Sequence, residues 1–310
     1  MSGISDIKIG YLEILDHLVV EIGRAGNKQS ESGACPDGVD TVIMGSWAAL
    51  THALCEGDIQ GAFIPLPEAM SLFSNGLDIK ILLLDCRPGT FVVANRAAGV
   101  ARLSDFKGKS VLLPGILSVY YLLFHRLMGS AGLRTGIENQ ATCDVFIEVV
   151  PSFMIPEMIS CDIDGDIAGC MVEEPFASRI IYEGYGKKIC HSRSLWPDHP
   201  HTALVMHDHV IDNHRSSVLE FVRWIAESNS AVYRQSPDLK FYLENMPDQK
   251  RSMMEKISTS AFSSKPFSLV PDIHLLEIIN DFMVKEMGLL NSIIRMDDFV
   301  DIQFAVEAGA

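Results

Sequence analysis

Histidines gather in one stretch of the chain. The segment "WPDHPHTALVMHDHVIDNH" (196–214) holds five of the ten histidines, and the pairs His199/His201 and His207/His209 are each spaced one residue apart. Alternating residues of a strand share a face, so each pair could offer two ring nitrogens to one zinc ion. No third ligand can be assigned from elsewhere in the sequence. The stretch leaves two interpretations open, a metal site or imidazoles held by hydrogen bonds.

Five short junctions form the second chemical feature, because at each one a strand pattern ends in a turn and a helix pattern begins at once. They are "LEILDHLVV", "MGSWAAL", "IPLPEAM", "LLPGILSVYY" and "MVEEPFASR". Asp16 and Ser46 suit an N-cap, and Pro67 and Pro175 suit the first position of a helix. In open α/β sheets, ligands bind at the carboxyl ends of strands, where helix N-termini offer free N–H groups. The junctions together predict a ligand cleft; the alternative is that each residue only caps its helix.

Catalytic patterns are weak in this sequence. Glu173 and Glu174 resemble a pair of carboxylates for acid/base chemistry, but neighbours on a strand point to opposite faces. The chain has no Gly-x-Ser-x-Gly elbow, P-loop or Gly-x-Gly-x-x-Gly fingerprint. We therefore expect a binding protein without a cofactor and not an enzyme.

Short apolar strands alternate with helical segments through the first two thirds of the chain, which predicts parallel sheets built from βαβ units. The expected strands are "IKIGYLEI", "DTVIMG", "GAFIPL", "IKILLLD", "TFVVANR", "KSVLLPG", "CDVFIEVVP", "GDIAGCMVEE", "KKICHSR" and "HTALVMHDHVI". The expected helices lie between them, at 16–26, 46–57, 67–76, 118–128, 156–160 and 175–182. Beyond residue 214 only helical spacing remains, in "SSVLEFVRWIAESNSAVY", "DLKFYLENM", "QKRSMMEKIST" and "DIHLLEIINDFMVKEMG".

Composition limits the possible partners. With a net charge of −15 and no basic cluster, the chain would repel a nucleic-acid backbone. The longest apolar run, "SVLLPGILSVYYLLF", is broken by Pro114 and Gly115 and is too short to span a bilayer. Seven cysteines without a Cys-x-x-Cys pair favour a reduced compartment. The start "MSGISDIKIGYLEIL" lacks a leader pattern, so we expect either a cytoplasmic protein or an exported one whose signal is missing here.

Several motifs resemble those of a known family when their order and spacing are taken together. They are Ser-Trp at 46 and 47, Pro-Leu-Pro at 65 to 67, Glu-Pro-Phe at 174 to 176, Gly-Tyr at 184 and 185, and Trp-Pro at 196 and 197. From about Ile7 to His214, the sequence is similar to the solute-binding proteins of nitrate, bicarbonate, sulfonate and taurine ABC importers.

The resemblance implies an α/β type II periplasmic-binding fold, in which two lobes joined by two crossing strands close over a small solute. "TFVVANR" would be the outward crossing and "HTALVMHDHVI" the return. Residues 1–95 and 204–310 would then form lobe one, with the helical tail packed on it, and residues 96–203 would form lobe two. On this scheme His199 and His201 lie near the lobe boundary, and a metal site there is the less favoured interpretation.

The resemblance also implies ligand contacts. The counterpart of Trp47 packs on the ligand in this family, and the Pro-x-Pro, Pro-Gly and Glu-Pro-Phe turns line the cleft. Together with the first junction, these motifs give the candidate ligand-binding residues Asp16, His17, Ser46, Trp47, Pro65, Gly115, Ser118 and Glu174.

The junctions depart from the nitrate-binding pattern because they are rich in carboxylates. Nearby cations are few, namely His17, His52, Arg87 and Arg179. A bare oxyanion would meet repulsion there, so an amine-bearing, heterocyclic or neutral solute is at least as well suited. The leading hypothesis is a monomeric substrate-binding protein, periplasmic or anchored outside the membrane, which presents a small solute to an ABC permease. The alternative is a cytosolic sensor of the same fold that signals to a protein partner.

Overall fold

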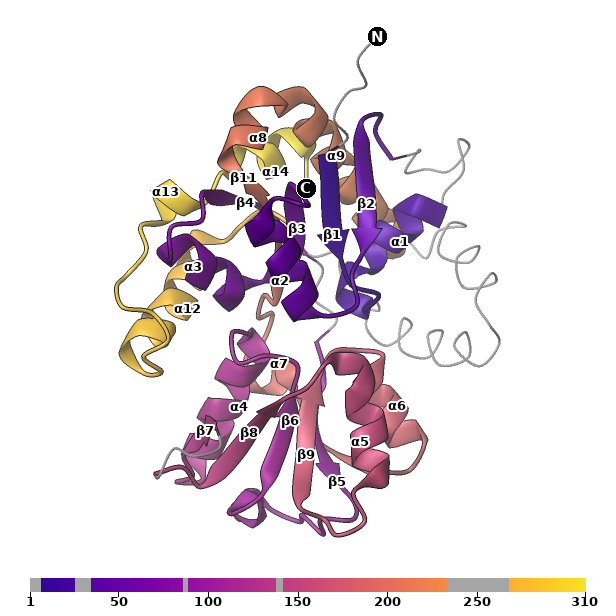
Figure 1. The fold of residues 1–310 in the computed structure, drawn as a ribbon, viewed down its shortest axis with the longest axis vertical. Helices are drawn as coiled ribbons and strands as arrows, with labels where there is room; N and C mark the ends of the chain where they lie inside the picture. Colours follow the sequence, from indigo (N-terminus) through magenta and orange to yellow (C-terminus); the bar gives the residue numbers. More distant parts are fainter. Residues whose placement is uncertain (1–6, 26–34, 86–88, 138–141, 234–267) are drawn as a thin grey trace. The chain divides into compact units, whose positions relative to one another are not determined.

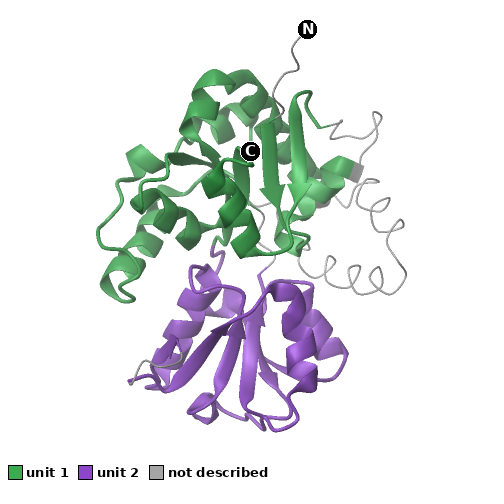
Figure 2. Cartoon of the chain, viewed as in Figure 1, with its two compact units in different colours: residues 1–87, 200–310 green, residues 88–199 purple. Residues whose placement is uncertain are grey.

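The protein is described by a computed structural model that covers residues 7–25, 35–85, 89–137, 142–233 and 268–310. The chain divides into two compact units. Unit 1 comprises Met1–Arg87 and Pro200–Ala310, and unit 2 comprises Pro88–His199 (Figure 2). Unit 1 is therefore built from two separate stretches of sequence, and unit 2 from one.

Unit 1 is a five-stranded sheet with helices on both faces. Its first stretch contains β1 (Ile7–Tyr11), η1 (Leu15–His17), α1 (Leu18–Ala25), β2 (Val39–Ile43), α2 (Trp47–Glu56), β3 (Gly61–Pro65), α3 (Leu66–Ser74) and β4 (Ile79–Leu84). Its second stretch contains β11 (Thr202–His207), α8 (Asp208–Asn213), α9 (Arg215–Tyr233), α12 (Ile273–Lys285), α13 (Met296–Phe299) and α14 (Gln303–Ala308). Figure 1 shows α2 and α3 on one side of this sheet and α1 and α9 on the other.

The strand order of this sheet, which we call sheet A, is β2-β1-β3-β11-β4. β1 runs parallel to β2 and β3, whereas β11 is antiparallel to β3 and β4. Every residue of β3 and β11 is buried, as expected for central strands covered on both faces. A strand from the second stretch of sequence therefore completes the centre of the sheet.

Unit 2 has a six-stranded sheet, sheet B, in the order β10-β5-β9-β6-β8-β7. Its elements are β5 (Phe91–Asn95), η2 (Leu103–Phe106), β6 (Ser110–Leu113), α4 (Val119–Ser130), β7 (Thr135–Ile137), β8 (Val145–Val149), η3 (Ser152–Met154), α5 (Ile155–Cys161), β9 (Ile167–Val172), α6 (Phe176–Tyr182), β10 (Gly186–His191) and α7 (Ser192–Leu195). β5 is antiparallel to β9 and β10, and the other pairs are parallel. Helices α4 and α7 contact each other, and so do α5 and α6 (Figure 1).

The two segments expected to cross between lobes are each a regular strand inside one unit. "TFVVANR" supplies β5, which pairs with β9 and β10 in unit 2. "HTALVMHDHVI" supplies β11 in unit 1, but the strand ends at His207 and α8 begins at Asp208. The units divide before residues 88 and 200, whereas the sequence placed the boundaries after residues 95 and 203. The difference arises because an apolar pattern shows that a segment is a strand but does not show which sheet the strand joins.

The C-terminal helices belong to unit 1, as the family resemblance implies. α14 packs on α9 and β4, and α12 packs on α3. Phe221 and Phe304 are fully buried in the same core as Ile9 and Leu204. The expected helices in "DLKFYLENM" and "QKRSMMEKIST" lie outside the described residues. In the part of the chain that is described, no helix is long and apolar enough to cross a membrane.

Candidate functional site

The carboxyl edge of sheet A gathers polar side chains from four strand ends. In a parallel arrangement the ends of β1, β2, β3 and β4 meet at one edge. Because β11 runs the opposite way, its first residues reach this same edge. The buried polar residues brought there are Asp16, His17, Asp85, His201 and Thr202. We call these five residues, with Trp47, the unit 1 cluster.

Asp16 and His201 form a buried pair in the unit 1 cluster. His201 Nδ1 donates to Asp16 Oδ2 over 2.5 Å, and the two side chains are 2% and 0% exposed. Asp16 lies in η1, directly after β1, and His201 precedes β11. The hydrogen bond therefore joins the two stretches of sequence that make up unit 1.

His17 is completely buried beside Asp16. Its Nδ1 lies 2.9 Å from the backbone N of Leu12 and 3.0 Å from the Leu12 carbonyl oxygen, which fixes the ring in place. Its Nε2 faces Asp85 Oδ2 at 3.7 Å. Burial lowers the pKa of His17 to about 4, although the negative charge of Asp16 opposes this shift. The ring is therefore neutral at physiological pH and brings no positive charge to the cluster.

Asp85 follows β4 immediately and was not among the residues predicted from the sequence. Thr202 donates from its hydroxyl to Asp85 Oδ2 over 3.3 Å, and the Asp85 backbone N–H donates to the Thr202 carbonyl over 3.1 Å. Both residues are fully buried. The one signal that could have found Asp85 is its place, an acidic residue directly after the apolar run "IKILLL" at the carboxyl end of a strand.

Trp47 lies between the two imidazoles of the cluster. Its ring meets His17 edge to face with centroids 5.7 Å apart, and meets His201 in the same way at 6.3 Å. The side chain is 9% exposed, so it is mostly packed. Ser46 caps α2, because its Oγ accepts from the Ala49 N–H over 3.2 Å. The cap sets the start of the helix and thereby places Trp47 at the edge of the sheet.

Pro65 ends β3 and precedes α3 at this edge. It is buried, and it pairs with Thr202 in the register of β3 and β11. Asp16, His17, Ser46, Trp47 and Pro65, all predicted from the sequence, thus share one edge of unit 1. Whether they contact a ligand stays a prediction.

Unit 2 has its own polar residues at the carboxyl edge of sheet B. Ser118 is 3% exposed and caps α4: its Oγ accepts from the Tyr121 N–H over 3.1 Å and donates to the Gly115 carbonyl over 3.0 Å. Gly115 is partly exposed, and a Cβ placed on it would meet no atom within 4 Å. The turn after β6 therefore leaves open space beside the backbone of residue 115.

Glu173 and Glu174 follow β9 and are both buried, but they have separate partners. Glu173 accepts from the Ser152 hydroxyl over 2.8 Å. Glu174 accepts from the Ser178 N–H over 2.9 Å and from its hydroxyl over 2.7 Å, within the first turn of α6. These contacts give Glu174 a capping role, which was the alternative kept for each junction residue.

The histidine stretch is divided between the two units. His199 lies at the end of unit 2. The centroid of its ring is 6.1 Å from that of Tyr120 and 6.5 Å from that of Trp196. His201 opens the second stretch of unit 1. The division between the units thus falls between these two residues, a few residues ahead of the boundary expected after residue 203.

The remaining His pair lies at the opposite end of β11. His207 donates from Nε2 to the Leu54 carbonyl over 2.9 Å, and its ring centroid is 5.4 Å from that of His209. Across the described residues, no group of three or more His, Cys, Asp or Glu side chains is arranged to hold a metal ion.

The other cationic candidates contribute little to the described cluster. His52 is exposed on α2, and Arg179 is bound to Glu183 over 2.8 Å on the surface of unit 2. Arg87 lies outside the described residues. Among the described residues, the buried acidic groups at the carboxyl edge of sheet A are Asp16 and Asp85.

Comparison with known proteins gives a family and a fold. The NMT1-like family model matches residues 3–240. The nitrate import ATP-binding protein NrtC of Synechocystis sp. is 21% identical over 294 residues, which cover 91% of this chain and 43% of that protein. The chain thus spans less than half the length of this curated relative.

Solved structures with similar folds include three binding proteins. The ligand-binding component of an ABC-type import system from Staphylococcus aureus, solved with zinc bound, has a TM-score of 0.80 at 22% identity, covering 98% of this chain and 99% of that one. The nitrate-binding protein NrtA from Synechocystis PCC 6803 has a TM-score of 0.76 at 16% identity, covering 99% and 88%. The alkanesulfonate-binding protein SsuA from Xanthomonas axonopodis pv. citri, bound to MOPS, has a TM-score of 0.75 at 13% identity, covering 97% and 99%. The predicted fold class and the resemblance to nitrate- and sulfonate-type binding proteins are confirmed.

Proposed function

Because the chain belongs to the NMT1-like family, we propose that it is the substrate-binding protein of an ABC importer and captures one small polar solute. The observation that carries this proposal is the unit 1 cluster, in which buried His17 and His201 contact the ring of Trp47 and each lies against a buried carboxyl group, that of Asp85 or Asp16. Buried polar groups are costly to assemble, and sets of them beside an aromatic ring at the carboxyl edge of an α/β sheet are typical of ligand sites.

The charge of the cluster bears on the class of solute. The carboxylates of Asp16 and Asp85 are fully buried, and the low pKa of His17 keeps its ring neutral. An oxyanion about 4 Å from one such carboxylate would be repelled by on the order of 1 kcal/mol or more, depending on the local dielectric. An amine-bearing, heterocyclic or neutral solute would instead donate hydrogen bonds to these oxygens. We favour this class over nitrate or bicarbonate.

Residues of the unit 1 cluster and the other site residues predicted from the sequence have proposed roles in holding the solute. The indole of Trp47 offers an apolar face for the body of the ligand, and Asp16 accepts hydrogen bonds from its donors. His17 and His201 position the two carboxylates. Ser46 and Pro65 set the helix starts at this edge, and Gly115 and Ser118 keep the ligand-binding role that the sequence predicted for them. Glu174 accepts hydrogen bonds from Ser178 in the first turn of α6, and its proposed role is to fix the shape of the turn before that helix.

The partner and compartment follow from the same proposal. NrtC is named for nitrate import, and the Staphylococcus aureus structure is a component of an import system. A binding protein of this kind hands its solute to a membrane permease outside the cytoplasm and acts as a monomer. Hinge closure over the solute stays part of the proposal, and no catalytic step is assigned to any residue.

A thermal-shift panel tests the proposal. The panel holds nitrate, bicarbonate, taurine, an alkanesulfonate, small amines and nitrogen heterocycles, and we expect an amine or heterocycle to raise the melting temperature. A ligand at a hundred times its Kd adds about 2.7 kcal/mol to the free energy of unfolding. If no member of the panel shifts the melting temperature, the solute-binding proposal loses its support. A shift with nitrate alone would contradict the proposed solute class.

Two variants test the site with the solute that the panel identifies. We expect Trp47→Ala to weaken binding by about tenfold or more, because it removes the aromatic face, whereas Trp47→Phe keeps most of the affinity. Asp16→Asn should weaken an amine more than a neutral solute. Affinity measured by calorimetry that is unchanged in a folded Trp47→Ala protein would remove Trp47 from the site.

A further inference from the structure

The connection between β8 and α5 crosses the carboxyl edge of sheet B. β8 ends at Val149, and α5, which begins at Ile155, packs on β9. Because β6 lies between β8 and β9 in the sheet, residues 149–154 pass over the end of β6. We call these residues the crossover loop. Ligands of open α/β sheets bind at this kind of edge, so the loop lies where a solute contact is expected.

Two hydrogen bonds hold the crossover loop at this edge. The Val150 N–H donates to the carbonyl of Leu113, the last residue of β6, over 2.9 Å. The Ser152 hydroxyl donates to Glu173 Oε2, directly after β9, over 2.8 Å. The loop is therefore bonded to the ends of both β6 and β9, and Phe153, which follows Ser152, lies at the same edge.

Three apolar side chains of the crossover loop are exposed to solvent. Val149 is 54% exposed, Phe153 is 55% exposed and Met154 is 43% exposed. No residue of the loop carries a charge, and the neighbouring carboxyl group of Glu173 is buried. Single exposed apolar residues are common on proteins, whereas several together on one uncharged segment mark a binding surface.

We propose that the crossover loop is a solute-contacting surface, in which Phe153 and Met154 pack on an apolar body of the solute. This inference rests on the proposed function and narrows its solute class. The carboxyl groups of the unit 1 cluster favour an amine or another donor, and the uncharged loop favours a part of the solute without polar groups. The solute is therefore an amine with an aromatic or aliphatic body. The flat ring of Phe153 and the flexible thioether of Met154 suit such a body.

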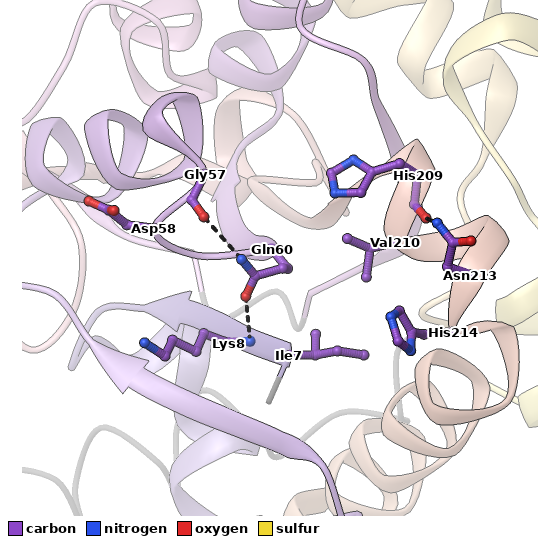
Figure 3. A pocket seen from close by; sticks show the side chains of 9 residues that line it. All are labelled: Ile7, Lys8, Gly57, Asp58, Gln60, His209, Val210, Asn213 and His214. Atoms are coloured by element: carbon purple, nitrogen blue, oxygen red, sulfur yellow. Dashed lines mark hydrogen bonds between the residues drawn. The ribbon is translucent and has the colours of Figure 1, made fainter. Parts of the chain in front are cut away.

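Unit 1 offers another place for an amine with an apolar body. A cavity of about 580 Å³ at the amino edge of sheet A is lined by Ile7 and Val210 and by the imidazoles of His209 and His214 (Figure 3). It lies at the end of sheet A opposite the unit 1 cluster. A variant in this cavity therefore shows whether a probe binds there instead.

Isothermal titration calorimetry on the full chain tests the crossover loop with benzylamine and methylamine, which share an amine and differ by a phenyl ring. We expect benzylamine to bind the parent about tenfold more tightly, because its ring gains apolar contacts. Phe153→Ala should weaken benzylamine binding by about tenfold and leave methylamine binding nearly unchanged. Phe153→Leu keeps an apolar side chain and should keep most of the benzylamine affinity.

Two control variants should bind benzylamine like the parent. Tyr182→Ala truncates another aromatic residue of unit 2, which is 73% exposed at the end of α6 away from the crossover loop. His209→Ala alters the cavity at the amino edge of sheet A. Melting temperatures without ligand confirm that each variant is folded.

The inference is overturned if benzylamine binds no more tightly than methylamine, or if Phe153→Ala weakens both probes equally or neither. It is also overturned if either control variant weakens benzylamine binding as much as Phe153→Ala does. The proposed function survives these results when another member of the solute panel binds and Trp47→Ala weakens that binding. If no member of the panel binds, both proposals fail.

Discussion

At the scale of single residues, the unit 1 cluster combines deep burial with two hydrogen-bonded pairs, Asp16 with His201 and Asp85 with Thr202. Asp16, His17 and Asp85 are fully buried, and His201 is 2% exposed. Such a set costs desolvation energy, which the hydrogen bonds between its members partly offset. The same burial makes the protonation of His17 unfavourable, and this links the cluster to pH.

His17 predicts a loss of stability in acid. Its pKa is about 4 in the folded protein against 6.5 for the free side chain, so the unfolded state binds the extra proton first. The stability that the neutral His17 ring contributes to the folded protein is fully present above pH 6.5 and is lost as the pH falls from 6.5 to 4. The difference between the two pKa values corresponds to a loss of about 3 kcal/mol in the free energy of unfolding.

Urea unfolding at several pH values in this window measures the effect. We expect His17→Gln to flatten the dependence of the unfolding free energy on pH, and we expect the exposed-site control His274→Gln to keep the slope of the parent. Equal slopes in the parent and His17→Gln would show that His17 does not titrate as described.

At the scale of elements, apolar patterns predicted most of the fold. Continuous apolar runs such as "IKILLL" became buried strands, and the expected helices begin within a few residues of their observed starts. Several short elements were not predicted, among them β7, α8 and α14. β7 has three residues at the edge of sheet B, which is too short for a pattern to reveal. α8 follows β11 without a break, and the short apolar run "HVI" suits a strand as well as a helix.

The candidate site could be predicted only in part. Asp16, Ser46 and Trp47 stand out because each follows a strand and begins a helical segment. Asp85 accepts a hydrogen bond from Thr202, which lies 117 residues further along the chain. His201 meets Asp16 across 185 residues. These pairs meet because β11 inserts antiparallel between β3 and β4. The register of that pairing cannot be predicted from the sequence.

Two glycines of unit 2 predict opposite effects on substitution, because Gly169 lies at the contact between β5 and β9 and Gly129 lies in open space on α4. A Cβ on Gly169 in β9 would lie 2.0 Å from the Val93 carbonyl oxygen, which belongs to the backbone and cannot turn away. Gly129, exposed on α4, has no atom within 4 Å of its Cβ position. We expect Gly169→Ala to destabilise unit 2 by about 3 kcal/mol or more, and Gly129→Ala to stabilise it by about 0.5–1 kcal/mol. Chemical denaturation compares the two, and a mild effect of Gly169→Ala would contradict the close approach of β5 and β9.

At the scale of the whole molecule, the two units differ in how they use the chain. Unit 2 is one continuous stretch with its own sheet and a core that includes Leu112 and Ile180. Unit 1 draws its sheet from both ends of the sequence, since β11 lies between β3 and β4. Removing the second stretch would expose the facing edges of β3 and β4, and unpaired edges of this kind invite aggregation.

Fragments of the chain test this difference. We expect residues 88–199 alone to fold and to unfold cooperatively in urea, as judged by circular dichroism. Residues 1–87 alone should show no cooperative transition, because they lack β11. A cooperative 1–87 fragment, or an unfolded 88–199 fragment, would show that the units do not have the independence that their sheets indicate.

The position of β11 also bears on the order in which the protein forms during synthesis. All of unit 2 has been made once residue 199 is added, but sheet A lacks a central strand until residue 207 leaves the ribosome. The middle of the chain can therefore fold first, while β1 to β4, although synthesised earlier, wait for a strand made more than a hundred residues later. A chaperone that shields nascent chains would find its binding segment in β3 and β4, during the interval before β11 arrives.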